Sequence, residues 1–275
     1  MKKTLVYHLY VGGDIDTNLC YKVHSECLRH FIHIFDNVRF TIAVDDLSNK
    51  ESIQKGVEWI LNLGTKCEIE MTVEENSNFR DALTFYKKVL KNNDDELIFF
   101  FHSKGTTNFV DEDRSIDSVF NWICGIYYYN LHDDYKTHGT LITTNKTMNG
   151  PFLLTPKENI GQNEKYYQFY AGAGYWINNV SLKNLVSSER IKEVGLSNKF
   201  LAEMYPGIVL STNEEYGLEG VNKKMFIQPQ IDGTAFYNGS IGDWEYIFSL
   251  YPYPEKAKEF IRYIGNKVGF MPFNY

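Results

Sequence analysis

Positive charge is scarce in this 275-residue sequence, which carries 28 Lys and Arg against 35 Asp and Glu, for a formal net charge of -7. Proteins that bind DNA or RNA neutralise phosphates with an excess of basic side chains, so this balance argues against nucleic acid as a partner. A basic pocket confined to one site remains compatible with it.

Long apolar runs are also missing. No window approaches the roughly 18 uncharged apolar residues that a membrane-spanning helix needs, and the first residues lack the apolar run of a signal peptide. We therefore expect a cytoplasmic protein that has at most a peripheral contact with the inner face of a membrane.

Cysteine is rare, and no two cysteines form a Cys-x-x-Cys pair. This usage predicts reduced thiols that pack as small apolar side chains, rather than disulfides or a zinc site. The four are Cys20, Cys27, Cys67 and Cys124.

Common catalytic motifs are absent as well: there is no P-loop, Gly-x-Gly-x-x-Gly, Gly-x-Ser-x-Gly or His-Glu-x-x-His. Three histidines, His24, His30 and His33, lie on or near one expected helix. No acid or cysteine completes a metal site with them, so we interpret them as surface histidines.

Apolar and aromatic residues, in contrast, are abundant. The apolar set AVILMFWYC makes up 43% of the chain and Phe, Trp and Tyr make up 16%, which is enough for a sizeable core. The length accommodates one large α/β domain or two small ones.

Hydrophobic periodicity predicts alternating strands and helices in the first hundred residues. This alternation implies right-handed βαβ crossovers and an open, mainly parallel sheet flanked by helices. The run Leu97 to Phe101 is unbroken, as in a central strand covered on both faces. The expected strands are 4–11, 39–44, 67–73 and 97–101, and the expected helices are 18–35, 50–63 and 80–91. In the second half we expect a helix over 116–135, a strand over 140–144, an aromatic stretch over 166–177 and helices from 198 and over 255–268.

Polar residues cluster where three of the expected strands end, which is the edge at which such sheets bind ligands. The first loop is Gly12-Gly13-Asp14 and the second contains Asp45 and Asp46. Carboxylates at the second position bind a ribose or a base N–H, or else cap the helix that follows or solvate the loop, and the sequence favours neither interpretation.

The third loop, His102-Ser103-Lys104-Gly105, is the sharpest signal because a Phe-rich strand delivers polar groups to the ligand edge. Lys104 offers a point charge for a phosphate, Ser103 can donate to oxygens, and Gly105 permits close backbone approach. The alternative is a solvated surface loop.

Three further segments are candidates with equally plain structural alternatives. Arg80 could bind a diphosphate or pair locally with Asp81. Around Gly172, Tyr175 and Trp176 the chain could form an aromatic platform for a sugar ring or an ordinary packed turn. Glu203 could be a general base with a raised pKa or a residue on the wet side of its helix.

Taken together, these segments resemble the GT-A glycosyltransferases, in particular the rhamnan-synthesis F-type and related capsular and lipopolysaccharide enzymes. The resemblance spans about residues 4 to 212, and we expect 213–275 to be a C-terminal extension that packs on this domain. The matching segments are Val44-Asp45-Asp46, Asn78 with Arg80-Asp81, His102-Ser103-Lys104-Gly105, Trp122 and Ala171-Gly172 to Tyr175-Trp176.

The resemblance implies an enzyme that transfers a sugar from a nucleotide-diphosphate sugar to a glycan or lipid-linked glycan acceptor, in surface polysaccharide or lipopolysaccharide biosynthesis. The implied catalytic residues are Glu203, Lys104 and His102. The implied donor-binding residues are Asp45, Asp46, Arg80, Asp81, Ser103 and Gly105, and the implied acceptor-binding residues are Gly172, Tyr175 and Trp176.

One departure from the family bears on mechanism, because His102-Ser103-Lys104 stands where metal-dependent members carry Asp-x-Asp. We therefore expect no required divalent metal, with Lys104 and Arg80 supplying the positive charge that stabilises the leaving diphosphate. Alternatively, His102 and Asp46 could bind Mn²⁺ or Mg²⁺ weakly. A rival function is a noncatalytic glycan-binding or scaffolding protein that kept the fold and lost the metal motif.

Overall fold

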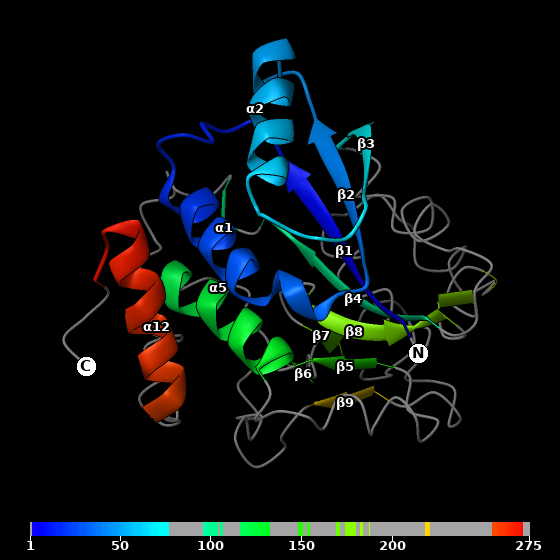
Figure 1. The fold of residues 1–275 in the computed structure, drawn as a ribbon, viewed down its shortest axis with the longest axis vertical. Helices are drawn as coiled ribbons and strands as arrows, with labels where there is room; N and C mark the ends of the chain where they lie inside the picture. The colour runs from blue at the N-terminus through cyan, green and yellow to red at the C-terminus, as the bar shows by residue number, and fades with distance from the viewer. Residues whose placement is uncertain are drawn as a thin grey trace, which may run out of the picture.

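The computed structural model describes the chain in segments (Figure 1). The longest described segments are residues 2–76, 116–132 and 255–271. The described residues are 2–76, 96–103, 105–106, 116–132, 148–150, 153–154, 169–170, 174–179, 182–183, 187, 218–220 and 255–271.

The described strands form a seven-stranded sheet in the order β3-β2-β1-β4-β8-β5-β9 and a two-stranded sheet of β6 and β7. β1 pairs in parallel with β2 and β4, and β2 pairs in parallel with β3, whereas β8 is antiparallel to both β4 and β5. The predicted α/β class with an open, mainly parallel sheet is confirmed. The bounds are β1 Lys2–Tyr10, β2 Asn37–Val44, β3 Ile69–Glu75, β4 Glu96–His102, β5 Met148–Gly150, β6 Leu153–Leu154, β7 Phe169–Tyr170, β8 Tyr175–Asn178 and β9 Leu218–Gly220.

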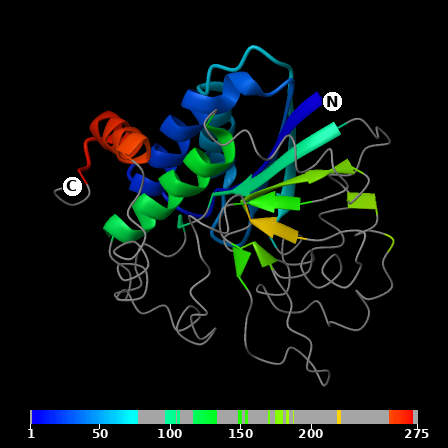
Figure 2. The ribbon, with the colours of Figure 1, turned by 90° about the horizontal axis from the view of Figure 1, so that it is seen from below.

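Among the described residues, the helices α1, α2 and α5 lie on one side of the main sheet, and α12 packs outside α1 and α5, as Figure 2 shows. Their bounds are α1 Leu19–Phe31, α2 Lys50–Leu61, α5 Ile116–Leu131 and α12 Glu255–Val268, and a short 3-10 helix, Ile32–Ile34, follows α1. The expected helices over 80–91 and from 198, and the expected strand over 140–144, lie outside the described residues.

Aromatic side chains fill the space between this side of the sheet and the helices. Six of the seven residues of β4 are buried, which confirms it as a central strand. The Phe101 ring lies 5.0 Å from that of Tyr127 on α5, and the Tyr7 ring lies 5.9 Å from that of His24 on α1. His24 is fully buried, so the expectation of a surface histidine was wrong there: its Nδ1 lies 3.0 Å from the Tyr127 hydroxyl.

The final helix, α12, packs against α1 and α5 through its apolar face. The Phe260 ring lies 5.3 Å from Phe31 and 5.7 Å from Tyr128, and Ile261 and Ile264 are buried. That face is therefore covered by protein and is not available to a lipid surface. No helix in the described part of the chain combines the length and the apolar character needed to cross a bilayer.

All four cysteines are free thiols, as predicted, and Cys20, Cys27 and Cys124 are buried. Burial raises the pKa of the Cys20 and Cys27 thiols, which keeps them in the protonated, unreactive form.

Candidate functional site at the carboxyl edge of the sheet

The strand order reverses at one point of the sheet edge. From β1 the chain moves to β2 and β3 on one side, and it then returns to β4 on the other side of β1. In open α/β sheets, ligands bind beyond the carboxyl ends of the strands at such a reversal of strand order. The polar loops that follow β1, β2 and β4 all leave from this edge.

Buried hydrogen bonds join the loop after β4 to the end of β1. The Tyr10 N–H donates to Ser103 Oγ at 2.9 Å, and the Ser103 N–H donates to the His8 carbonyl at 2.9 Å. Thr106 Oγ1 donates to the Ser103 carbonyl at 2.7 Å, and both Ser103 and Thr106 are buried. Ser103 thus has a structural role here, since its hydroxyl oxygen accepts a bond from the protein itself.

A second link joins this turn to the loop that leads into α1. Asn18 caps α1 by accepting from the Cys20 N–H, and its amide donates to the Thr106 carbonyl at 3.1 Å. The Tyr21 hydroxyl donates to the Tyr10 carbonyl at 2.7 Å. Burial raises the pKa of Tyr21 to about 12, so its hydroxyl stays protonated as a donor.

Gly105 is needed for the shape of the turn. Its φ of +85° lies in the region that side-chain-bearing residues rarely adopt. A Cβ there would lie 2.8 Å from Val119 Cγ1 on α5 and 3.0 Å from Cys20 Sγ on α1. The close approach predicted for Gly105 is thus explained, in this structure, by packing of the turn on two helices.

Asp45 organises the loop after β2. Its Oδ2 accepts from the Tyr10 hydroxyl at 2.6 Å, while its Oδ1 accepts from the Leu47 N–H at 2.9 Å and from Ser48 Oγ at 3.4 Å. Tyr10 therefore joins the ends of β1 and β2 through its side chain. Asp46 is exposed.

The helix α2 takes its N-cap from Asn49, not from Asp45 or Asp46. Asn49 Oδ1 accepts from the Ser52 N–H at 2.9 Å, and the Ser52 hydroxyl is paired with the Asn49 N–H. The N-cap interpretation of the two aspartates was therefore wrong. The loop interpretation agrees with the exposed Asp46 and with the bonds of Asp45 inside its own loop.

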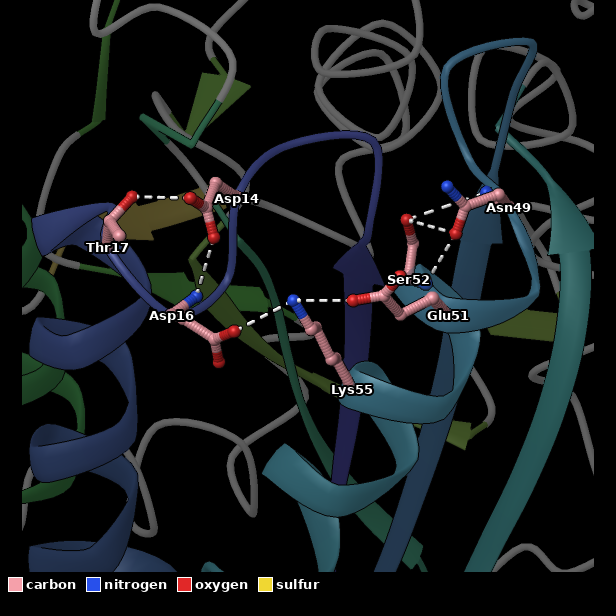
Figure 3. A network of polar contacts seen from close by, with 7 residues as sticks. All are labelled: Asp14, Asp16, Thr17, Asn49, Glu51, Ser52 and Lys55. Carbon is pink, nitrogen blue, oxygen red and sulfur yellow. Dashed lines mark hydrogen bonds and ion pairs between the residues drawn. The ribbon is translucent and has the colours of Figure 1, made fainter.

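A polar network at the surface joins the loop after β1 to the first turns of α2 (Figure 3). Lys55 Nζ lies 2.8 Å from Asp16 Oδ2 and 3.1 Å from Glu51 Oε1, and Asp16 above all raises the pKa of the Lys55 ammonium. The Asp14 carboxylate accepts from Thr17 Oγ1 at 2.7 Å, a bond that lowers its pKa. Exposed ion pairs contribute little free energy, so this network adds little to the stability of the fold.

Two histidines lie side by side on the face of the sheet opposite the helices. His8 and His102 are register partners on β1 and β4, and they alternate with Tyr7 and Phe101, which face α1 and α5. His8 is 2% exposed, and its Nε2 lies 3.5 Å from Asn76 Oδ1. Burial lowers the pKa of His8 to about 4, so this imidazole is neutral at pH 7.

The metal-binding alternative for His102 and Asp46 gains no support from the arrangement of the strands. β1 lies between β4 and β2, and so the two residues follow strands that are about 10 Å apart. Within the described segments no three His, Cys, Asp or Glu side chains form a group that could hold a metal ion.

Trp176 was expected to bind the acceptor, and the structure does not bear this out. Its side chain is fully buried, and its ring centroid lies 5.3 Å from the centroid of Phe99 and 5.8 Å from that of Phe35. Its Nε1 donates to the Asn130 carbonyl at 2.9 Å. It is a core residue and offers no face to a sugar. Tyr175 precedes it in β8, and its side chain is outside the description. Arg80, Asp81, Lys104, Gly172 and Glu203 also lie outside the described residues.

Sequence reasoning missed His8, Tyr10 and Tyr21, although each carries a polar group to the edge or directly beneath it. The available signal was the pattern of the first strand, where His8 interrupts an otherwise apolar run and Tyr10 stands at its last position. Tyr21 could not be told from a core aromatic residue without the fold.

No protein-family model matches this chain, and no curated protein matches it. Among solved structures, it is similar to 4-diphosphocytidyl-2C-methyl-D-erythritol synthase from Anaerococcus prevotii, at 8% identity over 86% of this chain and 96% of that one, with a TM-score of 0.39. It is also similar to mouse xyloside xylosyltransferase 1, at 8% identity over 79% and 77%, with a TM-score of 0.36. A third is 2-C-methyl-D-erythritol 4-phosphate cytidylyltransferase from Francisella tularensis, at 11% identity over 85% and 99%, with a TM-score of 0.32. Scores of this size assign neither a family nor an activity to the chain.

Proposed function

We propose that this chain is a glycosyltransferase that transfers a sugar from a nucleotide-diphosphate sugar to a glycan or lipid-linked glycan acceptor, in the assembly of a surface polysaccharide or lipopolysaccharide. The observation that carries the proposal is the position of the turn after β4. It leaves the sheet where the strand order reverses, and it is fixed to β1 by the bonds of Ser103 and Thr106. Nucleotides bind at this position in open α/β sheets, and the motif resembles that of GT-A glycosyltransferases.

In this proposal the positive charges of Lys104 and Arg80 meet the diphosphate as it departs. In the sequence, Lys104 stands between Ser103, whose hydroxyl accepts a bond from β1, and Gly105. A cation fixed before the reaction needs no reorganisation when negative charge develops, and this is how such groups lower a barrier. His102 lies at the foot of the same turn.

The remaining roles are those that the family resemblance implies. Asp45 and Asp46 contact the nucleoside, and Asp81 supports Arg80. Gly172 and Tyr175 are left as the acceptor side, since Trp176 is in the core. If the reaction inverts the anomeric centre, Glu203 takes the proton of the acceptor hydroxyl, whereas a retaining reaction needs no such base.

A thermal-shift panel of UDP-, GDP-, CMP- and dTDP-sugars tests the proposal. A ligand present at a hundred times its dissociation constant adds about 2.7 kcal/mol to the free energy of unfolding, which is a readily measured shift. We expect one nucleotide class to stabilise the protein and to serve as donor in a transfer assay. A protein that binds saccharides but no member of the panel would instead be the noncatalytic glycan-binding protein.

A further inference from the structure

The Tyr21 hydroxyl lies where three parts of the candidate site meet. Tyr21 belongs to the first turn of α1, and its hydroxyl donates to the Tyr10 carbonyl at the end of β1. Tyr10 in turn donates its N–H to Ser103 Oγ in the turn after β4. A Cβ added to Gly13 would lie 3.2 Å from the Tyr21 hydroxyl and 3.3 Å from the Thr106 carbonyl. The buried Tyr21 side chain therefore links α1 to the end of β1, and the Tyr10 backbone continues this link to the turn after β4.

Thr106 is the partner of this junction on the β4 side. Its Oγ1 donates to the Ser103 carbonyl at 2.7 Å, which closes the turn, and its own carbonyl accepts from the Asn18 amide at 3.1 Å. Thr106 is 4% exposed, so water does not replace these bonds at low cost. Buried hydrogen bonds of Ser103 and Thr106 thus fix the turn on both sides of Lys104 and Gly105 in the sequence.

We propose that Tyr21 and Thr106 are positioning residues, which hold the turn of residues 103–106 at the distance from the β1 loop that a diphosphate requires. The inference rests on the proposed function and deepens it, because it assigns the diphosphate part of the ligand to this junction. Neither residue contacts the ligand, since both are buried. They act through the backbone of Ser103 and Gly105, the residues on either side of Lys104 in the sequence.

The test compares Tyr21→Phe with Tyr127→Phe. Tyr127 is an equally buried tyrosine whose hydroxyl bonds to His24 within the core, away from the edge. Both variants keep the ring and lose one buried hydroxyl, so both should lower the melting temperature to a similar extent. Calorimetry then measures the affinity of wild type and of each variant for UDP, GDP and dTDP, and for the matching monophosphates.

We expect Tyr21→Phe to weaken the binding of the diphosphate about five- to tenfold and that of the monophosphate less than about twofold, in line with the loss of one buried hydrogen bond. Tyr127→Phe should change neither affinity. Thr106→Val should behave as Tyr21→Phe does, while Thr106→Ser, which keeps the hydroxyl, should retain wild-type affinity.

Three results would count against the inference. Equal diphosphate affinity in Tyr21→Phe and Tyr127→Phe would make the junction purely structural. Equal losses for monophosphate and diphosphate would place its effect on the nucleoside instead. Binding of none of the six nucleotides to wild type would overturn the proposed function, and with it this inference, whereas the first two results leave the proposed function standing.

Discussion

Acidification should destabilise this protein in part by protonating His8 on unfolding. The pKa of His8 is lowered by burial from 6.5 to about 4, so between these values the unfolded chain binds a proton that the folded chain does not. Stability is therefore complete above pH 6.5 and falls as the pH drops towards 4. At 1.36 kcal/mol per pH unit, the loss reaches about 2 kcal/mol at pH 5 and about 3 kcal/mol at pH 4.

The assay is urea denaturation followed by tryptophan fluorescence at pH 7, 5 and 4. Wild type is compared with His8→Gln, which removes the titrating group and keeps a side-chain amide near Asn76. His33→Gln, at an exposed position after α1, is the control. Between pH 7 and pH 4 the free energy of unfolding should fall by about 3 kcal/mol more in wild type than in His8→Gln. Parallel pH dependence of these two proteins, with the same slopes, would refute the reasoning about His8.

Three further predictions concern the edge of the sheet and the core beside it. Gly105→Ala should lower the free energy of unfolding by about 2 to 4 kcal/mol, because the new Cβ adds a contact at 2.8 Å to a strained φ. The control Gly64→Ala, at a φ of +75° with open space around it, should lower it by only about 1 kcal/mol. Equal losses for the two variants in urea denaturation would contradict this account. Tyr10→Phe should cost about 1 kcal/mol and change nucleotide affinity measured by calorimetry, since Asp45 loses a donor; unchanged affinity would remove Asp45 from the site. Trp176→Phe should lower the melting temperature, because the bond to Asn130 is lost, and should leave the affinity for the acceptor unchanged. A weaker affinity for the acceptor would show that Trp176 binds it.

The first half of the fold could be predicted because its local signals agree with one another. The apolar run of β4 requires cover on both faces, and the helical spacing of α1 and α2 supplies apolar stripes on one side of the sheet. Strand ends could then be located to within about two residues, and with them the loops at the edge of a parallel sheet.

Contacts within the site could not be predicted, since they depend on the register between distant strands. The bond from Tyr10 to Ser103 joins residues 93 positions apart, and the pairing of His8 with His102 requires β4 to lie next to β1. Trp176 was misread for the same reason. An aromatic residue beside glycines fits a sugar platform or a core equally well until β8 is known to lie beside Phe99.

The most direct test of the central claim is sugar transfer in excess EDTA by wild type, Lys104→Ala and Lys55→Ala, each with the matched nucleotide sugar. Lys55 is a surface lysine near the same edge, paired with Asp16 and Glu51, and it serves as the control for loss of a positive charge. We predict full activity of wild type and near-wild-type activity of Lys55→Ala, with turnover by Lys104→Ala reduced by about a hundredfold or more. Unchanged turnover by Lys104→Ala, or loss of wild-type activity in EDTA, would contradict the account.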